Sequence, residues 1–312
     1  MKKTELLSKF YSLFLASCIT LSVYGVLFTY HAESAPVLTK YWQSVTSSLD
    51  GARLFAVVNG GNIYSSNDGG ITWAQITFDA KRSWFSIASD QTGMKLVAVV
   101  NGGNVYSSID GGVTWTATKA PIKGWRAVAS NADGSKLIAG GYGNPIYTSS
   151  DGGLTWIART TDKYIYSIAS DVTGAKLAAT EYNGNILISN DAGITWTLKD
   201  SVRKWFSITA SSDGKKLAAV EIGGKIYTST DGGLNWIARS SAGSRNWNSI
   251  SSSSDGSVLV ATVTSGSSVL TGEIYVSLDG GETWTSKSSA VNWKDVTVLS
   301  DGKGFVAVGY GS

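Results

Sequence analysis

Apolar residues along this chain gather in short runs of strand length, separated by polar, glycine-rich segments. The run Trp84–Ala88 is followed by Leu96–Val100, then by the pair Gly102-Gly103 and the run Val105–Ser107. Glycine reaches positive φ without steric cost, so the glycine pair predicts a tight hairpin between the last two runs. Turn signals recur about every 8–12 residues and no helical stretch interrupts them, which is typical of an all-β fold.

This group of runs repeats with a period near 40 residues, and each repeat contains the octapeptide Ser-x-Asp-Gly-Gly-x-Thr-Trp or a close variant. The aspartates of the octapeptide lie 42, 41, 40, 40 and 48 residues apart, at Asp68, Asp110, Asp151, Asp191, Asp231 and Asp279. Its tryptophans are Trp73, Trp115, Trp156, Trp196, Trp236 and Trp284. A second marker is an aromatic residue that opens the first run of each repeat: Trp42, Trp84, Trp125, Tyr166, Trp205, Trp247 and Trp293. The two markers account for all 12 tryptophans, with Tyr166 as the one substitution. Four strands in a period of about 40 residues indicate the blades of a propeller.

The octapeptide resembles the Asp-box, or BNR repeat, of sialidase-like β-propellers, and the resemblance covers residues 42–312. It implies a seven-bladed β-propeller of four-stranded blades, one for each opening aromatic. The aspartate of such a box can accept backbone N–H groups of its own turn, the glycines permit the chain reversal, and the tryptophan packs across the hairpin. We therefore expect the boxes to be structural, without a catalytic aspartate.

The last blade is incomplete in sequence. Trp293–Ser300 predicts its first strand and Gly304–Tyr310 its second, and Gly311-Ser312 follow. Residues 35–41 can supply one outer strand but not two. Two alternatives remain open at this point: a blade of three strands, or a chain truncated relative to a longer relative.

The first 34 residues predict a targeting segment, with the propeller in residues 35–312. Phe10–Tyr30 contains no charged residue and follows Lys2, Lys3 and Lys9. About 20 apolar residues span a bilayer as a helix, whereas a signal-peptide core is usually about 7–15. Both an anchor helix that keeps residues 10–30 in the membrane and a signal peptide cleaved after Ser34 fit this pattern. The lysines favour a cytoplasmic N-terminus, so either alternative predicts a propeller outside the cytoplasm, secreted or membrane-anchored.

Cys18 is the only cysteine of the chain. Leu15–Cys18 resembles the bacterial lipobox, in which the cysteine is lipidated, but the residues that follow stay apolar. The alternative is a cysteine that serves as a small apolar residue within a helix.

Composition excludes several kinds of chemistry. One cysteine leaves no disulfide framework and no cysteine-based zinc ribbon, and one histidine removes nearly all histidine-dependent metal sites and most hydrolases with a catalytic histidine. We expect no metal and no cofactor. The formal net charge is only +3, from 26 basic and 23 acidic residues, which gives no support for a nucleic-acid partner.

Asp-box propellers include sialidases, xyloglucan hydrolases and photosystem II assembly factors. The sequence lacks the Arg-Ile-Pro motif of the sialidases, and its seven arginines do not form their substrate-binding triad. Another glycosidase needs two carboxylates roughly 5–10 Å apart, for which Glu181 and Glu221 are the best pair. In size and plan the chain resembles the photosystem II assembly factors more closely. We therefore expect a non-catalytic module that binds a protein or a glycan, with a glycoside hydrolase as the alternative.

Charge is predicted to differ between the two faces of the ring. Asp133, Asp171, Asp213, Asp255 and Asp301 follow the first strands and join the Asp-boxes on one face. Basic residues lie on the opposite face, just before or after the opening aromatics: Lys40, Arg82, Lys123, Arg126, Lys163, Arg203, Lys204 and Arg245. Clustered like charge focuses the electric field, so this basic face predicts binding of an acidic protein segment or an anionic glycan. The alternative is an ordinary solvated surface.

Overall fold

The computed structural model describes residues 19–22, 40–76, 80–264, 272–288 and 291–310 of the chain. All of the regular secondary structure in these ranges is β-strand, which confirms the all-β prediction. None of the described residues forms an apolar helix of the length that a membrane crossing requires.

Each repeat folds as one antiparallel unit in which consecutive strands are neighbours. The strands of the first three units are β2 (Trp42–Ser47), β3 (Leu54–Gly61), β4 (Ile63–Ser66), β5 (Ala74–Ile76), β6 (Arg82–Ser89), β7 (Leu96–Gly103), β8 (Val105–Ser108), β9 (Thr116–Ala117), β10 (Lys123–Ser130), β11 (Leu137–Gly141), β12 (Tyr147–Ser149) and β13 (Ile157–Ala158). The next three contain β14 (Ile165–Ser170), β15 (Leu177–Ser189), β16 (Thr197–Ala210), β17 (Leu217–Gly224), β18 (Ile226–Ser229), β19 (Ile237–Arg239), β20 (Arg245–Ser252), β21 (Leu259–Val263), β22 (Glu273–Ser277) and β23 (Thr285–Ser288). In the fourth unit β15 combines the second and third strands, and β16 continues from its fourth strand into the first strand of the fifth unit.

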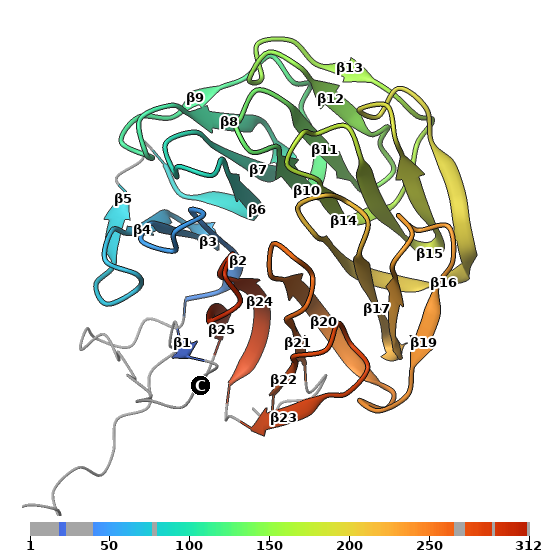
Figure 1. Ribbon diagram of the computed structural model, residues 1–312. Helices are drawn as coiled ribbons and strands as arrows, with labels where there is room; N and C mark the ends of the chain where they lie inside the picture. Colours follow the sequence, from blue (N-terminus) through green and yellow to red (C-terminus); the bar gives the residue numbers. More distant parts are fainter. Residues whose placement is uncertain (1–18, 23–39, 77–79, 265–271, 289–290, 311–312) are drawn as a thin grey trace, which may run out of the picture.

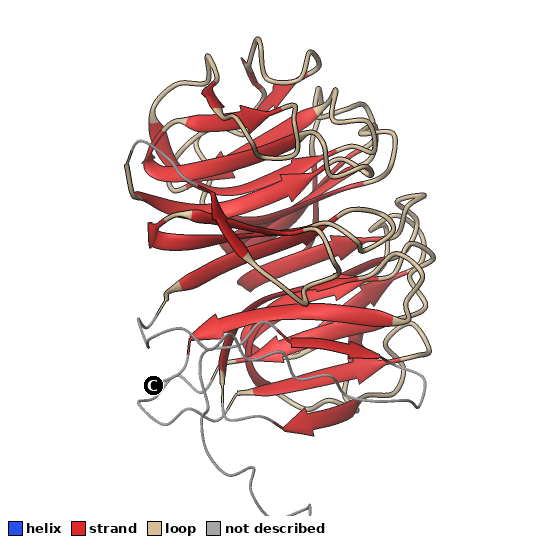
Figure 2. Cartoon of the chain, turned by 90° about the vertical axis from the view of Figure 1, so that its left-hand side faces the viewer, coloured by secondary structure: helices blue, strands red, loops and turns tan. Residues whose placement is uncertain are grey.

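The units are arranged in a ring around a central channel (Figure 1). Seen from the side, the strands run across the thickness of the ring from one face to the other (Figure 2). The channel is lined by the first strand of each unit, namely β2, β6, β10, β14, the second half of β16, β20 and β24 (Asn292–Val298). The hairpin between second and third strands of one unit reaches the start of the next first strand, as in the pair Gly103↔Lys123. We call this side the hairpin face and the opposite side the Asp-box face.

The core of the molecule lies between neighbouring units. One cluster joins Phe55, Val57 and Ile63 of the first unit to Trp84 and Ile87 of the second. Equivalent clusters recur around the ring, and one of them packs Trp42 against Val306 and Val308, which joins the first unit to the last. Burying apolar surface at each junction, including this one, stabilises a closed ring.

The fourth unit corrects one prediction. Tyr166 does not occupy the position of the opening tryptophans, because Ile165 pairs with Glu181 in the register in which Trp205 pairs with Glu221. Ile165 is fully buried, and Tyr166 lies one residue later, in the channel wall. The buried position accepts an isoleucine in place of tryptophan because the third-strand residue that packs against it is also smaller in this unit. Leu187 replaces the third-strand tyrosine that packs edge-on against Trp205 in the fifth unit, where Tyr227 has this role.

The last unit has three strands in the described residues, in the order β1-β25-β24. Gly304–Tyr310 forms β25, as expected, and Ile19–Ser22 forms β1, which pairs with it in antiparallel fashion. The prediction of an apolar helix through residues 10–30 is therefore wrong for these four residues. The physical reason is that β25 presents a free edge, whose backbone groups a strand can satisfy and a helix cannot. The third strand thus comes from residues 19–22 and not from 35–41, of which 35–39 lie outside the described residues. The number of seven full blades stays a prediction.

Other predictions for the N-terminal segment concern residues that the structure does not describe. Cys18, the rest of the apolar stretch and the cleavage site after Ser34 all lie outside the described residues.

Candidate functional site

The Asp-boxes form closely similar hydrogen-bonded turns, with Asn235 in place of the threonine in the fifth box and no indole bond from Trp73 in the first. In the third unit the carboxylate of Asp151 accepts hydrogen bonds from the backbone N–H of Thr155, at 2.9 Å, and from the hydroxyl of Ser149, at 2.7 Å. The same serine oxygen accepts the N–H of Gly153 at 2.8 Å, and Trp156 donates its indole N–H to the carbonyl of Gly153. The Thr155 hydroxyl also donates to this carboxylate. That bond has the largest effect on Asp151 and, with the bonds from the Thr155 N–H and the Ser149 hydroxyl, lowers the pKa of Asp151 to about 2. Every oxygen of the carboxylate serves its own turn, which is the structural role expected.

The basic residues predicted for the hairpin face share one repeat position, two residues before the buried residue that opens the first strand. They are Lys40, Arg82, Lys123, Lys163, Arg203 and Arg245. We call this set the basic rim. Lys204 lies beside it and is exposed, whereas Arg126 points into the channel.

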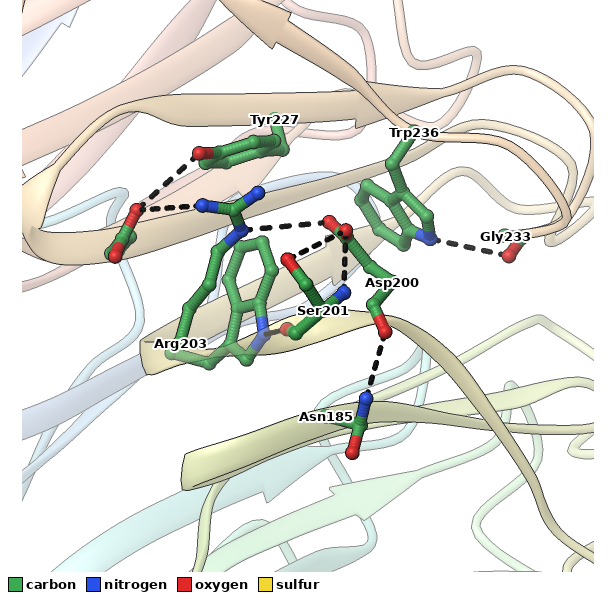
Figure 3. Close-up of polar contacts among 9 residues, drawn as sticks. Asn185, Asp200, Ser201, Arg203, Tyr227, Gly233 and Trp236 are labelled. Atoms are coloured by element: carbon green, nitrogen blue, oxygen red, sulfur yellow. Dashed lines mark hydrogen bonds and ion pairs between the residues drawn. The ribbon is translucent and has the colours of Figure 1, made fainter.

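Rim residues are held against tyrosines of their own units. The Lys40 ammonium lies 4.4 Å from the ring centre of Tyr64, and the Arg203 guanidinium lies 4.7 Å from that of Tyr227. Figure 3 shows Arg203 between the ring of Tyr227 and the side chain of Asp200. Arg82 and Arg245 stack in the same way, at 4.9 and 4.8 Å from Tyr106 and Tyr275. Such cation–π packing fixes the rim in place at the channel mouth.

Among the described residues, three members of the basic rim are seen to pair with a glutamate. Lys163 pairs with Glu181 at 3.4 Å, Arg203 with Glu221 at 3.8 Å, and Arg245 with Glu273 at 3.8 Å. The glutamates reduce the net charge of the rim over the fourth to sixth units. Near Glu273, burial and the hydrogen bond from the Tyr275 hydroxyl raise the pKa of Tyr275 to about 12.

A cavity of about 340 Å³ fills the channel on the hairpin side. The residue after each opening position projects into it: Gln43, Phe85, Arg126, Tyr166, Phe206, Asn248 and Lys294. Deeper in the wall a serine recurs in most units, but the last unit has Asp295 there instead. Lys294, Asp295 and Tyr166 were not predicted as site residues. Aligning the units at the buried opening position would have shown them as departures from the repeat.

The opposite mouth is built by the main chain. Each of the first six turns that follow a first strand donates one backbone N–H to a carbonyl of the next turn. The residues involved are, in order, Leu49, Gln91, Ala132, Val172, Ser212, Ser254 and finally the acceptor Ser300. The hydroxyl of Ser300 donates to the carbonyl of Leu49 and closes the ring. Four of the five aspartates expected on this face occupy exposed or half-exposed turn positions. Asp171 is the exception, because it is buried as the acceptor of the N–H groups of Ala175 and Lys176.

The family model of the BNR/Asp-box repeat matches residues 275–286, which contain the sixth copy of the turn described above. The chain thus carries an Asp-box repeat on a β-propeller fold. A search of curated proteins finds no match to its sequence.

Solved structures support the propeller fold. The GH74 enzyme of Niastella koreensis has a TM-score of 0.71 and 16% identity over 88% of this chain, which spans 52% of that enzyme. YCF48 from Cyanidioschyzon merolae has a TM-score of 0.67 and 19% identity, over 88% of this chain and 95% of that one. YCF48 bound to D1 peptide has a TM-score of 0.69 and 16% identity, over 96% of both chains. The expected likeness to photosystem II assembly factors thus holds for the fold. At these identities the comparisons describe architecture, and binding or catalysis has to be argued from the site.

The propeller places Glu181 and Glu221, the best carboxylate pair for the alternative of a glycoside hydrolase, on neighbouring units. Glu181 and Glu221 each end a second strand, and each is engaged by the rim cation of its own unit. Ion pairing of both carboxylates favours a structural role for the pair. Among the described residues no three His, Cys, Asp or Glu side chains are grouped as metal ligands.

Proposed function

We propose that this propeller is a non-catalytic binding module outside the cytoplasm that engages a protein partner through its hairpin face. The observation that carries the proposal is the basic rim around a cavity that contains two further cations, Arg126 and Lys294. A concave site with converging charge and aromatic walls is the usual form of a binding site. The propeller of YCF48 bound to D1 peptide supports a protein partner for a ring of this size.

A location outside the cytoplasm is supported by the sequence of the N-terminal segment, with three lysines before an uncharged stretch. Membrane contact through residues 10–30 belongs to the same proposal. It requires that the segment is retained and that Ile19–Ser22 leaves its pairing with β25.

The test uses a fluorescein-labelled synthetic peptide rich in Asp and Glu, with binding measured by fluorescence anisotropy at several salt concentrations. The triple variant Arg82→Gln, Arg203→Gln, Arg245→Gln removes rim charge. Glutamine is preferred to glutamate because a glutamate would face Glu221 and Glu273. We expect tight binding at low salt, a loss of affinity as salt is raised, and at least tenfold weaker binding by the variant.

The matched control is the double variant Lys215→Gln, Lys303→Gln, which removes exposed charge from turns on the Asp-box face. It should bind the peptide as the natural chain does. Equal binding by the rim variant and the natural chain, with the same salt dependence, would overturn the proposal. So would tighter binding of a sulfated oligosaccharide than of the peptide, because the partner would then be an anionic glycan.

A glycoside hydrolase is the second candidate, because the GH74 propeller shares the fold. Xyloglucan oligosaccharides and a fluorogenic sialoside provide its test. Turnover that is lost in Glu181→Gln or Glu221→Gln would replace the binding-module proposal with this one.

A further inference from the structure

The channel contains two cations that interrupt the repeat. At the position after each opening residue, the other units have Gln43, Phe85, Tyr166, Phe206 and Asn248. The third unit has Arg126 and the last has Lys294. The units otherwise repeat closely, and five of the seven have an uncharged residue here. The propeller fold therefore does not require the two charges, which are a feature of this cavity.

Arg126 is positioned by aromatic side chains. Its guanidinium lies 3.9 Å from the ring centre of Tyr166 and 5.2 Å from that of Phe206. One terminal nitrogen donates to the hydroxyl of Tyr142 at 2.8 Å. Its Nε is buried and has no hydrogen-bond partner in the described part of the chain. The other terminal nitrogen, Nη2, forms no hydrogen bond in the described part of the chain and is not buried. The guanidinium therefore retains a donor that an incoming ligand can use.

Lys294 approaches the same space from the last unit. Burial, and then the nearby charge of Arg126, lower the pKa of the Lys294 ammonium, which places the two cations within electrostatic reach of each other. In the described part of the chain neither forms an ion pair, in contrast to Lys163, Arg203 and Arg245 of the basic rim. Two like charges in one cavity are unfavourable until an anion lies between them.

The protein supplies one carboxylate near these cations, Asp295, and that carboxylate is already hydrogen-bonded to the channel wall. Asp295 is the one carboxylate among the described residues that line the cavity. It accepts hydrogen bonds from the Ser249 hydroxyl at 2.6 Å and the Val45 N–H at 3.0 Å, and so it is committed to the wall.

We propose that the channel binds a carboxylate group of the protein partner, held between Arg126 and Lys294. This inference rests on the proposed function and names the chemistry that its site recognises. A planar guanidinium with available N–H donors suits a carboxylate, and charge-assisted hydrogen bonds are about twice as strong as neutral ones. Phe85, Tyr166 and Phe206 surround the site with aromatic surface, which fits a carboxylate that carries an apolar group.

The size of the cavity limits what enters. About 340 Å³ is near the lower end of the range of ligand pockets, which suits one or two residues of a polypeptide and not a folded domain. The carboxylate can come from two sources on a protein: the end of its chain, or an Asp or Glu side chain on a projecting loop.

Three small probes distinguish these sources, with binding to the full chain measured by ligand-observed NMR titration. N-acetyl-phenylalanine carries a terminal carboxylate, its amide lacks one, and the α-methylamide of N-acetyl-aspartate carries only a side-chain carboxylate. The variants Arg126→Gln and Lys294→Asn copy the residues that the first and sixth units have at this position, namely Gln43 and Asn248. Lys215→Gln is the control of equal charge on the Asp-box face, and thermal denaturation verifies that each variant is folded.

We expect at least one carboxylate probe to bind, the amide not to bind, and each channel variant to weaken binding at least tenfold, whereas Lys215→Gln leaves it unchanged. The tighter carboxylate probe identifies the source. Equal binding of acid and amide, or unchanged affinity in both channel variants, would overturn the inference. If the rim triple variant loses the acidic peptide while both channel variants retain it, the channel inference fails and the proposed function stands.

Discussion

In five units the turn between the first and second strands is closed by a hydrogen bond from a hydroxyl to a carboxylate, and the two residues exchange positions between units. Ser211 donates to Asp213 at 2.7 Å in the fifth unit, whereas Thr92 donates to Asp90 at 2.7 Å in the second. In both turns the side chain of the first residue accepts a hydrogen bond from the backbone N–H five residues later: Ser211 from Lys216, and Asp90 from Lys95. In the units that have such a pair the hydroxyl and the carboxylate can stand in either order. The third unit uses Asn131 and Asp133 instead, and the last uses Leu299 and Asp301.

This exchange predicts a pairwise rescue. Thr92→Asp places a second carboxylate beside Asp90 and removes its hydroxyl donor, which should destabilise the protein by about 1 kcal/mol. Adding Asp90→Ser restores the order of Ser211 and Asp213, so the double variant should regain most of the lost stability. Thermal denaturation followed by circular dichroism measures both. A double variant no more stable than Thr92→Asp would refute the exchange.

Among the strands, the tryptophan that opens a unit acts together with a tyrosine of the third strand. Trp205 and Tyr227 pack edge-on with ring centres 5.0 Å apart, and Trp247 and Tyr275 do so at 5.1 Å. The fourth unit replaces both members, with Ile165 and Leu187 in one apolar cluster. The two positions therefore form one packing unit, in which a change at one is matched at the other.

We expect the two positions to be coupled energetically. Ile165→Trp alone overfills a packed site and should cost about 1–3 kcal/mol. Combined with Leu187→Tyr it recreates the pair that the other units contain, so the cost of the double variant should be clearly less than the sum of the single costs. Urea unfolding of the four proteins gives the coupling free energy. Additive costs would show that the positions are independent.

The sequence was most informative about elements and least informative about contacts between them. Strand order within a unit followed from the glycine hairpins and the octapeptide, because both are local signals. Tyr166 was predicted at the opening position because it is aromatic, whereas the position requires a buried side chain, which here is Ile165. The rim cations were found in sequence, but their tyrosines and glutamates lie on other strands. Lys294 joins Arg126 only once the ring closes.

In the whole molecule, the junction between the last and first units differs from the others. At three interior junctions a serine hydroxyl accepts an N–H of the next first strand, as Ser207 accepts that of Ile250 at 3.2 Å. At the closing junction the acceptor of the Val45 N–H is Asp295. Burial is the largest influence on this carboxyl and raises its pKa. Ring closure therefore depends on a group that can titrate.

Asp295→Ser restores the acceptor used at those three interior junctions and makes closure independent of this titration. A raised pKa in the folded state means that the contribution of Asp295 to stability is greatest at acidic pH and declines as pH rises through that pKa. We therefore expect the Tm of Asp295→Ser, relative to the natural chain, to increase from pH 4 to pH 8. Lys294 and Arg126 face the same channel and are unchanged in both proteins. A Tm difference that is constant with pH would contradict the assignment.

Because the Asp-box mouth is built from main-chain hydrogen bonds, the residues needed for assembly of the ring are different from those available for ligand binding. Its bonds join backbone groups, with the Ser300 hydroxyl as the one side-chain donor, so most substitutions leave the diameter of that opening unchanged. The hairpin mouth, in contrast, is formed by side chains that can be exchanged singly. Descendants of this chain can thus acquire new ligands at one end while assembly is maintained at the other. Divergence among relatives should accordingly be concentrated around Arg126 and Lys294, with the turns from Leu49 to Ser300 conserved in length.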